Sequence, residues 1–499
     1  MLSTILASSM AFIDGTALNV ILPSLQKDLA ASGSDLFWVL NSYLLMLAAL
    51  ITVGGSLGDK KGRVKVFMIG ILIFTLGSAA CGLAQNIDQL ILFRAVQGLG
   101  GALMIPGSLS IISAVFSKEE KGRAIGTWSA ATTVVTVCGP VLGGALADIG
   151  LWRLIFFINL PLGVFALFVL KYKVPESREE GSSSVDWWGA GLLVASLFAF
   201  TYGLLEMPEI GSTHPLVVSS LAAGVVLMVA FIVVEIRVND PILPFSLFKN
   251  RTFSGVNLLS FFLYAALGGM MLFLSLNVIQ VQGYSQLQAG LTFLPFSFLM
   301  ILMGRKMGAL ADKYGPKRFL VIGPLITSLG IYLLAMIGMT EGPQAYWTTY
   351  FPYFLIFAFG MSMTVVPLTT AVMSSVSEGK SGIASGINNS VTRIAGTFMN
   401  AILGAVAIYL FVGFVKEDTE VLRLSVDQIE RIVLEAENLG EAQPPESLES
   451  TQSALVDSLY DNSFIKTYRW VGVLSAILAL VSSLIAAVMV DDKDCVSNS

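Results

Sequence analysis

The sequence predicts an all-α polytopic membrane protein with fourteen transmembrane helices, arranged as two six-helix bundles related by pseudo-twofold symmetry plus two inserted helices. Of the 499 residues, 55% are hydrophobic and 13% are charged, whereas a soluble domain carries about 25% charged residues. The mean hydropathy is +0.78. A short glycine- and lysine-containing segment also returns at half the chain length. Lipid is therefore the solvent of most of the chain.

The apolar runs are long enough to cross a membrane, since a helix of roughly 20 residues spans about 30 Å of hydrocarbon. The first run, 2–25, lacks the basic start of a signal peptide and is interrupted by Asp14 and Asn19, so it is taken as a span. The fourteen predicted spans are 2–25, 36–58, 65–84, 88–114, 123–148, 152–172, 186–206, 214–236, 252–279, 287–311, 318–339, 346–376, 382–415 and 467–490.

The repeated segment defines the two halves of the chain. The first copy is a basic loop after span two, Gly55-Ser-Leu-Gly-Asp59-Lys-Lys-Gly62-Arg63-Val-Lys65. The second copy is Gly308-Ala-Leu-Ala-Asp312-Lys-Tyr-Gly315-Pro-Lys317-Arg318, at an offset of 253 residues. Internal repeats of this kind are common in secondary transporters.

The offset pairs span two with span ten, so spans one to six and nine to fourteen form the two bundles, and spans seven and eight are inserted between them. The predicted units are an N-terminal bundle, 1–172; the inserted pair with its linkers, 173–251; a C-terminal bundle, 252–490; and a tail, 491–499.

Basic residues predict the orientation, because cytoplasmic loops carry an excess of Lys and Arg. Most of the 29 bases lie in the tail and in the loops on the same side as the N-terminus. Both termini are therefore expected in the cytoplasm. The protein itself is expected in the plasma (inner) membrane.

The acidic segment 416–466 is then expected on the outer face. Ser425-Val-Asp-Gln428 resembles a capping box that begins a helix ending near Gly440. After Pro444 and Pro445, the spacing of Leu448, Leu455 and Leu459 suggests a second short helix. A partly ordered acidic loop is the alternative.

Three charged residues, Asp14, Arg94 and Arg393, lie well inside predicted spans. An ionisable group near the bilayer centre costs at least about 2.5 kcal/mol and persists where it faces a cavity or a partner. Arg94 shares a helical face with Gln97, and Arg393 shares one with Asn389. For Asp14, a functional role in such a cavity is one interpretation, and a hydrogen bond to a neighbouring helix is the structural alternative. Arg393 fits a role in helix packing equally well.

Span five carries Gly139-Pro140-Val-Leu-Gly143-Gly144. Gly139 and Gly143 form a small-residue step that lets two helix backbones approach closely. Pro140 removes a backbone hydrogen bond and bends the helix. Ordinary tight packing would account for the same residues.

Together these segments resemble the major facilitator superfamily, and within it the fourteen-span drug:proton antiporters. The loop at Gly55–Lys65 is similar to the signature after span two, with a partial copy at Gly308–Arg318 that departs at Pro316. The other motifs that carry the resemblance are Asp14-Gly-Thr16-Ala-Leu-Asn19 in span one, Leu90-x-x-x-Arg94-x-x-Gln97-Gly98 in span four, Gly139–Gly144 in span five and Trp152-Arg153-x-x-Phe156-Phe157 after it. The long acidic outer loop resembles that of the quaternary-ammonium and fluoroquinolone exporters, a multidrug type, more than that of the exporters in tripartite pumps.

The resemblance implies proton-driven efflux of amphipathic, cationic drugs by alternating access. Asp14 would bind a proton or a cation and Arg94 would tune its proton affinity, because a nearby arginine favours the ionised carboxylate. Gly55, Asp59, Gly62, Arg63 and Asp312 would form the latch between the bundles, and Gly139, Pro140, Gly143 and Gly144 a hinge that limits leak. Asn19, Gln97, Asn389 and Arg393 are candidates for the cavity.

Other functions fit less well. A proton-coupled exchanger or uptake carrier for a defined metabolite is the alternative within transport, and the span-five motif argues against it. A membrane receptor would not need charges inside the bilayer. An enzyme is not expected, because no nucleophile–base set, metal cluster or nucleotide loop is present. We expect no cofactor and no metal, a proton gradient as energy source, drugs or lipophilic cations and the lipid bilayer as partners, no nucleic acid, and a monomer.

Overall fold

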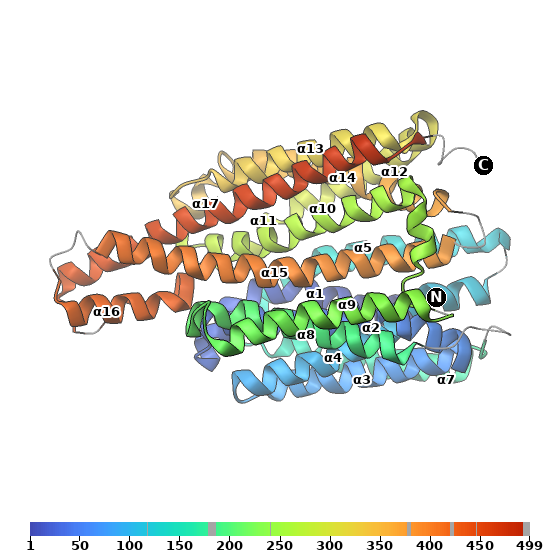
Figure 1. The fold of residues 1–499 in the computed structure, drawn as a ribbon, viewed down its shortest axis with the longest axis horizontal. Coiled ribbons are helices and arrows are strands. Elements are labelled where there is room, and N and C mark those ends of the chain that lie inside the picture. Colours follow the sequence, from blue (N-terminus) through green and yellow to red (C-terminus); the bar gives the residue numbers. More distant parts are fainter. Residues whose placement is uncertain are drawn as a thin grey trace.

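A computed structural model describes residues 1–116, 118–177, 186–239, 241–376, 381–419, 424–445 and 447–492. Fourteen helices in these ranges are long and apolar enough to cross a membrane. They run side by side as one elongated bundle, with both termini at one end of the molecule and α16 at the other (Figure 1). These ends are called the terminal end and the α16 end below. The fourteen spans and the all-α fold are confirmed.

The N-terminal half contains six spans, because α6 and α7 continue each other as one. Its helices are α1 (Leu2–Leu29), α2 (Gly33–Lys61), α3 (Arg63–Leu83), α4 (Ile87–Val115), α5 (Lys118–Asp148), α6 (Leu154–Phe157) and α7 (Asn159–Lys173). Polar caps begin several of them. Ser32 and Asp35 form a capping box at the start of α2, and the Asn86 side chain accepts from the Gln89 amide at the start of α4.

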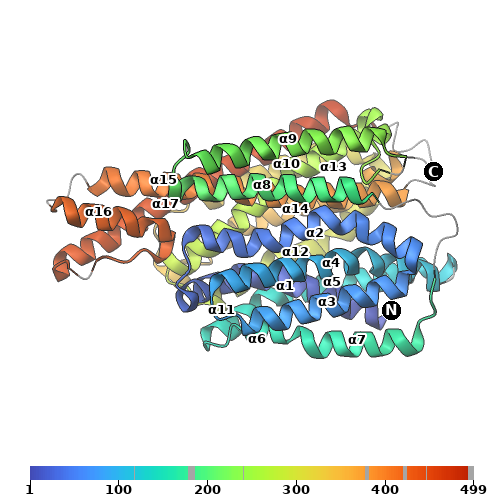
Figure 2. The same cartoon turned by 60° about the horizontal axis from the view of Figure 1, so that its bottom comes forward.

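The inserted pair is α8 (Trp187–Ile210) and α9 (Pro215–Arg237), followed by the short helix η1 (Phe245–Lys249). Figure 2 shows α8 between α9 and α2. Leu193 and Leu197 of α8 pack on Leu45 and Ala49 of α2. The α8 helix also contacts α15, so the pair covers the place where α2 and α15 of the two halves meet.

The C-terminal half supplies the other six spans. Its helices are α10 (Arg251–Leu276), η2 (Asn277–Val281), α11 (Gln286–Thr292), α12 (Leu294–Tyr314), α13 (Pro316–Ala335), η3 (Gly342–Ala345), α14 (Tyr350–Ser374), α15 (Ser381–Thr419), α16 (Val426–Glu435), η5 (Ala436–Glu441) and α17 (Ser450–Met489). One large apolar core runs through both halves, with Phe37 of α2 and Phe273 of α10 in ring contact.

The predicted second short helix of the acidic segment is wrong as a separate element. Residues 450–466 are the first part of α17, which runs for 40 residues. At 1.5 Å per residue this helix is about 60 Å long, twice the thickness of the hydrocarbon. No glycine or proline interrupts it between Ser450 and Val471, so nothing stops the helix where the apolar run begins.

The capping box at Ser425 and Gln428 is confirmed, because each side chain bonds the backbone of the other residue and starts α16. The turn after α16 falls at Leu439, which has a positive φ of 55°, rather than at Gly440. Residues 426–441 form a cap over the two halves. Gln26 of α1 donates to the Asn438 carbonyl at 3.1 Å, and Gln280 of η2 donates to Glu441 at 3.2 Å.

Candidate functional site

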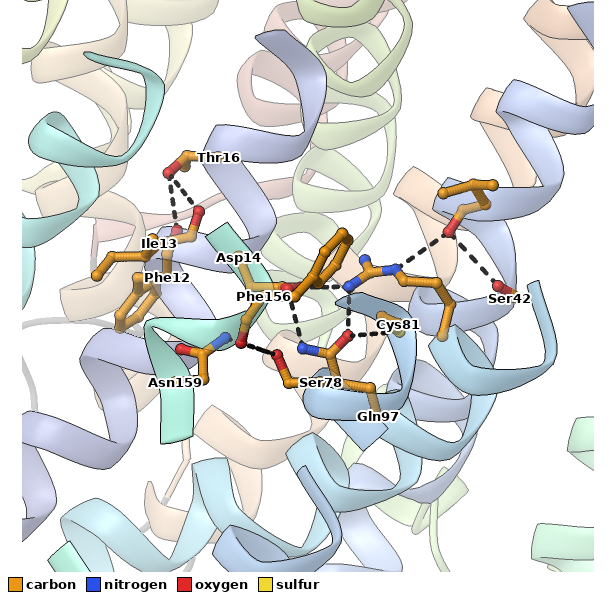
Figure 3. Close-up of polar contacts among 12 residues, drawn as sticks. Phe12, Ile13, Asp14, Thr16, Ser42, Ser78, Cys81, Gln97, Phe156 and Asn159 are labelled. Carbon is orange, nitrogen blue, oxygen red and sulfur yellow. Dashed lines mark hydrogen bonds and ion pairs between the residues drawn. The ribbon is translucent and has the colours of Figure 1, made fainter. Parts of the chain in front are cut away.

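The centre of the N-terminal half holds a buried ion pair between α1 and α4. The Arg94 Nη1 lies 2.5 Å from Asp14 Oδ2, and the two side chains are 1% and 2% exposed. Gln97, one turn after Arg94, donates to Asp14 Oδ1 at 2.9 Å and accepts from Arg94 Nη1 at 2.7 Å. Both carboxylate oxygens of Asp14 are therefore occupied, and the three side chains form a closed network (Figure 3).

Helix α2 completes this network with groups that the sequence motifs did not indicate. Arg94 Nε donates to the Val39 carbonyl at 3.3 Å, and the guanidinium lies 4.3 Å from the centre of the Tyr43 ring. On the other side, Cys81 of α3 contacts Gln97 Oε1 at 3.7 Å. The cation–π contact adds to the stabilisation of the buried guanidinium.

Arg393 of α15 comes from the C-terminal half and is near enough to the same tyrosine for an electrostatic interaction. It interacts in this way with Tyr43 of α2 and with Tyr264 of α10. Open space lies beside α15 here, because a Cβ built on Gly386 or Gly396 meets nothing within 4 Å. Asn389 is exposed and donates to its own helix at the Ser385 carbonyl.

Asn19 is half-buried on α1, five residues after Asp14. A rotation of 100° per residue turns it about 140° from the direction of Asp14. The structure thus brings Asp14, Arg94 and Gln97 together. It leaves Arg393 within electrostatic range of Tyr43 and leaves Asn19 and Asn389 outside this group. Among the described residues, no three metal-ligating side chains lie together.

The glycine motif of α5 lies against two helices of different halves. A Cβ on Gly143 would lie 2.9 Å from the Ala17 side chain of α1, and one on Gly139 would collide with Thr16. A Cβ on Gly144 would collide with the Gln286 backbone of α11, and one on Gly290 with the Pro140 carbonyl. The segment around Pro140 therefore packs α5 on α1 with one face and on the C-terminal half with the other.

The end of α5 is also hydrogen-bonded to the start of α11. Asp148 accepts from the backbone amides of Gln286 at 2.8 Å and Leu287 at 3.1 Å. A carboxylate at a helix N-terminus accepts hydrogen bonds from the free backbone amides and interacts favourably with the helix dipole. Ser24 of α1 adds a hydrogen bond of 2.9 Å to the Gln286 side chain. We call this set of contacts the α5–α11 clamp.

The segment Gly55–Lys61 is not the loop that the sequence predicted, since α2 continues through Lys61. Its glycines are not needed for the approach of α2 to α4, since a Cβ on Gly55 would stay 3.7 Å from Pro106. The close approach lies one residue earlier, at Gly54, where a Cβ would collide with the Ala102 carbonyl of α4. Gly62 alone separates α2 from α3, with φ of 111°, a conformation that disfavours other residues. Asp59 and Arg63 form an ion pair of 2.7 Å across this junction, at 35% and 21% side-chain exposure.

An acidic residue that the motif search missed anchors each copy of the junction. Glu176 accepts from the amides of Val64 at 2.9 Å and Lys65 at 3.0 Å, capping α3. In the second copy, Asp492 accepts from the Lys317 amide at 2.9 Å and lies against Gly315, which has φ of 84°. Each acid comes three residues after the last helix of its half. The backbone of Asp312 belongs to α12, and its side chain lies outside the described residues.

Residues 4–417 match the model of the major facilitator superfamily. The chain belongs to this superfamily. It is similar to the multidrug resistance protein Stp of Mycobacterium tuberculosis, with 32% identity over 415 residues that cover 81% of this chain and 75% of that protein. The tetracenomycin C resistance and export protein of Streptomyces glaucescens is 29% identical over 484 residues, covering 96% of this chain and 88% of that one.

Solved structures of the superfamily have the same fold. A bacterial homologue of the human lysosomal transporter Spinster, solved in an inward-facing and unoccupied conformation, superposes with a TM-score of 0.69 at 18% identity and covers 98% of this chain and 96% of that chain. The superfamily match and the multidrug resistance relatives make this chain a multi-pass membrane transporter of small molecules and not an enzyme. It has fourteen candidate spans.

Proposed function

We propose that the protein exports amphipathic, cationic drugs in exchange for protons, and that Asp14 is the group for which both compete. The observation that carries this proposal is the buried network of Asp14, Arg94 and Gln97. Asp14 lies near the middle of α1, and the whole residue is 3% exposed. The names of the similar proteins, a multidrug resistance protein and an antibiotic resistance and export protein, support drugs as the substrates.

The competition follows from charge balance. A carboxylate in a site of low polarity needs a partner, which here is Arg94; a proton or a cationic drug would take the place of the guanidinium. When Asp14 is neutralised, Arg94 loses its counter-charge and keeps only neutral partners, which are the Gln97 side chain, the Tyr43 ring and the Val39 carbonyl. The cost of that state favours a rearrangement of α1, α2 and α4, which would link proton binding to a change of conformation.

Alternating access requires the halves to part at one end while they close at the other. The α5–α11 clamp and the cap of residues 426–441 join the halves at the α16 end. We propose that this is the outer end, that the clamp opens when drug is released, and that the Asp59–Arg63 junction acts as the latch at the terminal end. The proton gradient is then the energy source, and no cofactor is needed. The transporter lies in the plasma membrane and works as a monomer.

Transport by everted membrane vesicles tests the function. Vesicles with an imposed proton gradient should accumulate a cationic dye, and the accumulation should collapse when the gradient is dissipated. Accumulation that persists without a gradient would contradict proton coupling. Accumulation of neutral and anionic amphiphiles at the same rate would contradict the cation preference.

Labelling of single cysteines tests the orientation. Lys61 is exposed at the terminal end and Ala454 is exposed beyond the opposite end of the spans. In a background without Cys81, Cys138 and Cys495, Lys61→Cys should react only from the cytoplasm and Ala454→Cys only from outside. Labelling of both from the same side would contradict the topology.

A further inference from the structure

The inserted helix pair contains two buried carboxyl groups that the transport site does not use. Asp186 immediately precedes α8, and Glu235 lies in the last turn of α9, so both are at the terminal end of the pair. They are 7% and 2% exposed. Burial of this degree is rare for acidic residues without a partner.

Each carboxyl group has one oxygen that is hydrogen-bonded and one that is not. Asp186 Oδ1 accepts from the Gly189 amide at 2.8 Å, and Glu235 Oε2 accepts from the Leu243 amide at 2.8 Å. The remaining oxygens, Asp186 Oδ2 and Glu235 Oε1, are buried and have no hydrogen-bond partner in the described part of the chain. A buried polar atom of this kind requires an explanation.

The two unpartnered oxygens face the same small space. A Cβ built on Gly189 would lie 2.6 Å from Glu235 Oε1 and still closer to Asp186 Oδ2, so the oxygens are at most about 5 Å apart. Gly189 leaves this space open because it has no side chain. The two groups from different helices therefore point at each other across it.

In the described part of the chain, no Lys or Arg forms an ion pair with Asp186 or Glu235. Val53 of α2, Ala190 of α8 and Ile242 of the following segment pack into one apolar cluster beside them. The described charged groups on the neighbouring elements are exposed or interact with other groups. Lys60 and Lys61 of α2, Arg237 of α9 and Lys249 of η1 are exposed. Asp59 pairs with Arg63, and Arg393 of α15 interacts electrostatically with Tyr43 and Tyr264.

We propose that Asp186 and Glu235 form a second proton-binding site, which holds one proton between Asp186 Oδ2 and Glu235 Oε1. Two carboxylates this close in an apolar environment cannot both ionise without strong repulsion. One proton from water at the terminal end converts them into a carboxylic acid and a carboxylate joined by an O–H···O hydrogen bond, and lowers their joint charge from −2 to −1. Both unpartnered oxygens are then satisfied.

This proton fastens the inserted pair to the C-terminal half. Glu235 holds the Leu243 amide, and Leu243 packs both on the α2–α8 contact and on the core of the C-terminal half. The segment then continues through η1 into α10, and the Asn250 side chain donates to the Ser375 carbonyl after α14 at 3.1 Å. Loss of the proton leaves two repelling charges where this segment is attached, so the attachment weakens as the pH at the terminal end rises.

Infrared difference spectroscopy of the purified protein in lipid nanodiscs tests the site directly. Glu235→Gln keeps an acceptor for the Leu243 amide and offers an N–H donor to Asp186, so it imitates the protonated pair. Asp186→Asn does the same from the other side and keeps the cap of α8. Glu206→Gln, at the opposite end of α8, is the matched control.

A pH step should show carbonyl absorption that disappears on raising the pH, and beside the contribution of Asp14 this absorption should include that of one protonated carboxyl group per chain from the Asp186–Glu235 pair. The parent and Glu206→Gln should show the contribution of the pair equally, and both Glu235→Gln and Asp186→Asn should lack it. An unchanged signal in either of these variants would overturn the proposal, because the signal would then come from other carboxyl groups.

Thermal unfolding in the same nanodiscs provides an independent measurement. The protonated pair is the stable form, so the unfolding midpoint of the parent should fall as the pH rises through its titration. Glu235→Gln and Asp186→Asn should each flatten this part of the pH profile while Glu206→Gln does not. If one of these two variants fails to fold, the other provides the test. An unfolding midpoint that falls with pH in the variant as steeply as in the parent would contradict the fastening role.

Discussion

The Asp14–Arg94 pair predicts a large stability cost when either member is neutralised alone. Asp14→Asn leaves a guanidinium that is 1% exposed without a counter-charge. Removing one partner of a buried ion pair costs about 3–5 kcal/mol, because the other charge stays buried and unpaired. Arg94→Gln should cost a similar amount, since the carboxylate then retains only the amide of Gln97.

The double variant Asp14→Asn/Arg94→Gln should recover most of this loss. It carries no buried charge, and its remaining cost is that of rearranged neutral hydrogen bonds, about 1 kcal/mol each. The coupling free energy between the two sites should therefore be several kcal/mol. Denaturant titration in mixed micelles, followed by tryptophan fluorescence, measures the four free energies of unfolding.

The exposed pair of Asp427 and Arg431 on α16 provides the control. Its side chains are 78% and 61% exposed, so Asp427→Asn should change the free energy of unfolding by no more than about 0.5 kcal/mol. If the single variants at Asp14 and Arg94 also cost less than about 1 kcal/mol, or if their costs simply add in the double variant, the buried-pair reasoning is refuted.

Further predictions concern the junctions and the contacts between the halves. Asp59→Asn should express normally and lose dye transport several-fold, because its partly exposed ion pair contributes at most about 1 kcal/mol to stability; normal transport would contradict the latch. Glu176→Gln removes a carboxylate from the start of α3 and should cost about 0.5–2 kcal/mol in a denaturant titration, whereas an unchanged unfolding curve would exclude the capping role. Gly144→Val should abolish transport in vesicles, because its side chain collides with the backbone of α11; full activity would rule out the clamp. Replacing Thr419–Ser463 with a Gly/Ser linker should still allow membrane insertion, since no span is removed, and shift the range of exported dyes; loss of insertion would contradict it.

The fold could be predicted because each span is an apolar run, and the repeated segment related the two halves. The end of a helix was predictable only where the sequence contains a signal for it. Ser425 and Gln428 mark the start of α16, but no glycine or proline between Ser450 and Val471 marks a helix end where the apolar run of α17 begins. The basic junction was taken for a loop because it contains glycines, but α2 continues through Gly55 and Gly58 and ends only at Lys61.

The candidate site was predictable residue by residue but not as a geometry. Asp14 and Arg94 are 80 positions apart, and their pairing follows from how α1 packs on α4. Tyr43 looked like any aromatic residue of a span. Glu176 and Asp492 act on amides of helices far away in the sequence, and Asp186 and Glu235 resembled ordinary charges at the ends of apolar runs, so only tertiary contacts reveal them.

Proton release induced by drug tests the central claim most directly. The protein in sealed proteoliposomes, with a pH indicator on the drug side, should release protons when a cationic drug is added to the wild-type sequence. The Asp14→Asn variant should insert into the liposomes normally, yet release no protons when the drug is added. The Asp14→Glu variant should release protons with a shifted pH profile. Undiminished drug-induced proton release by Asp14→Asn would remove Asp14 from the coupling mechanism.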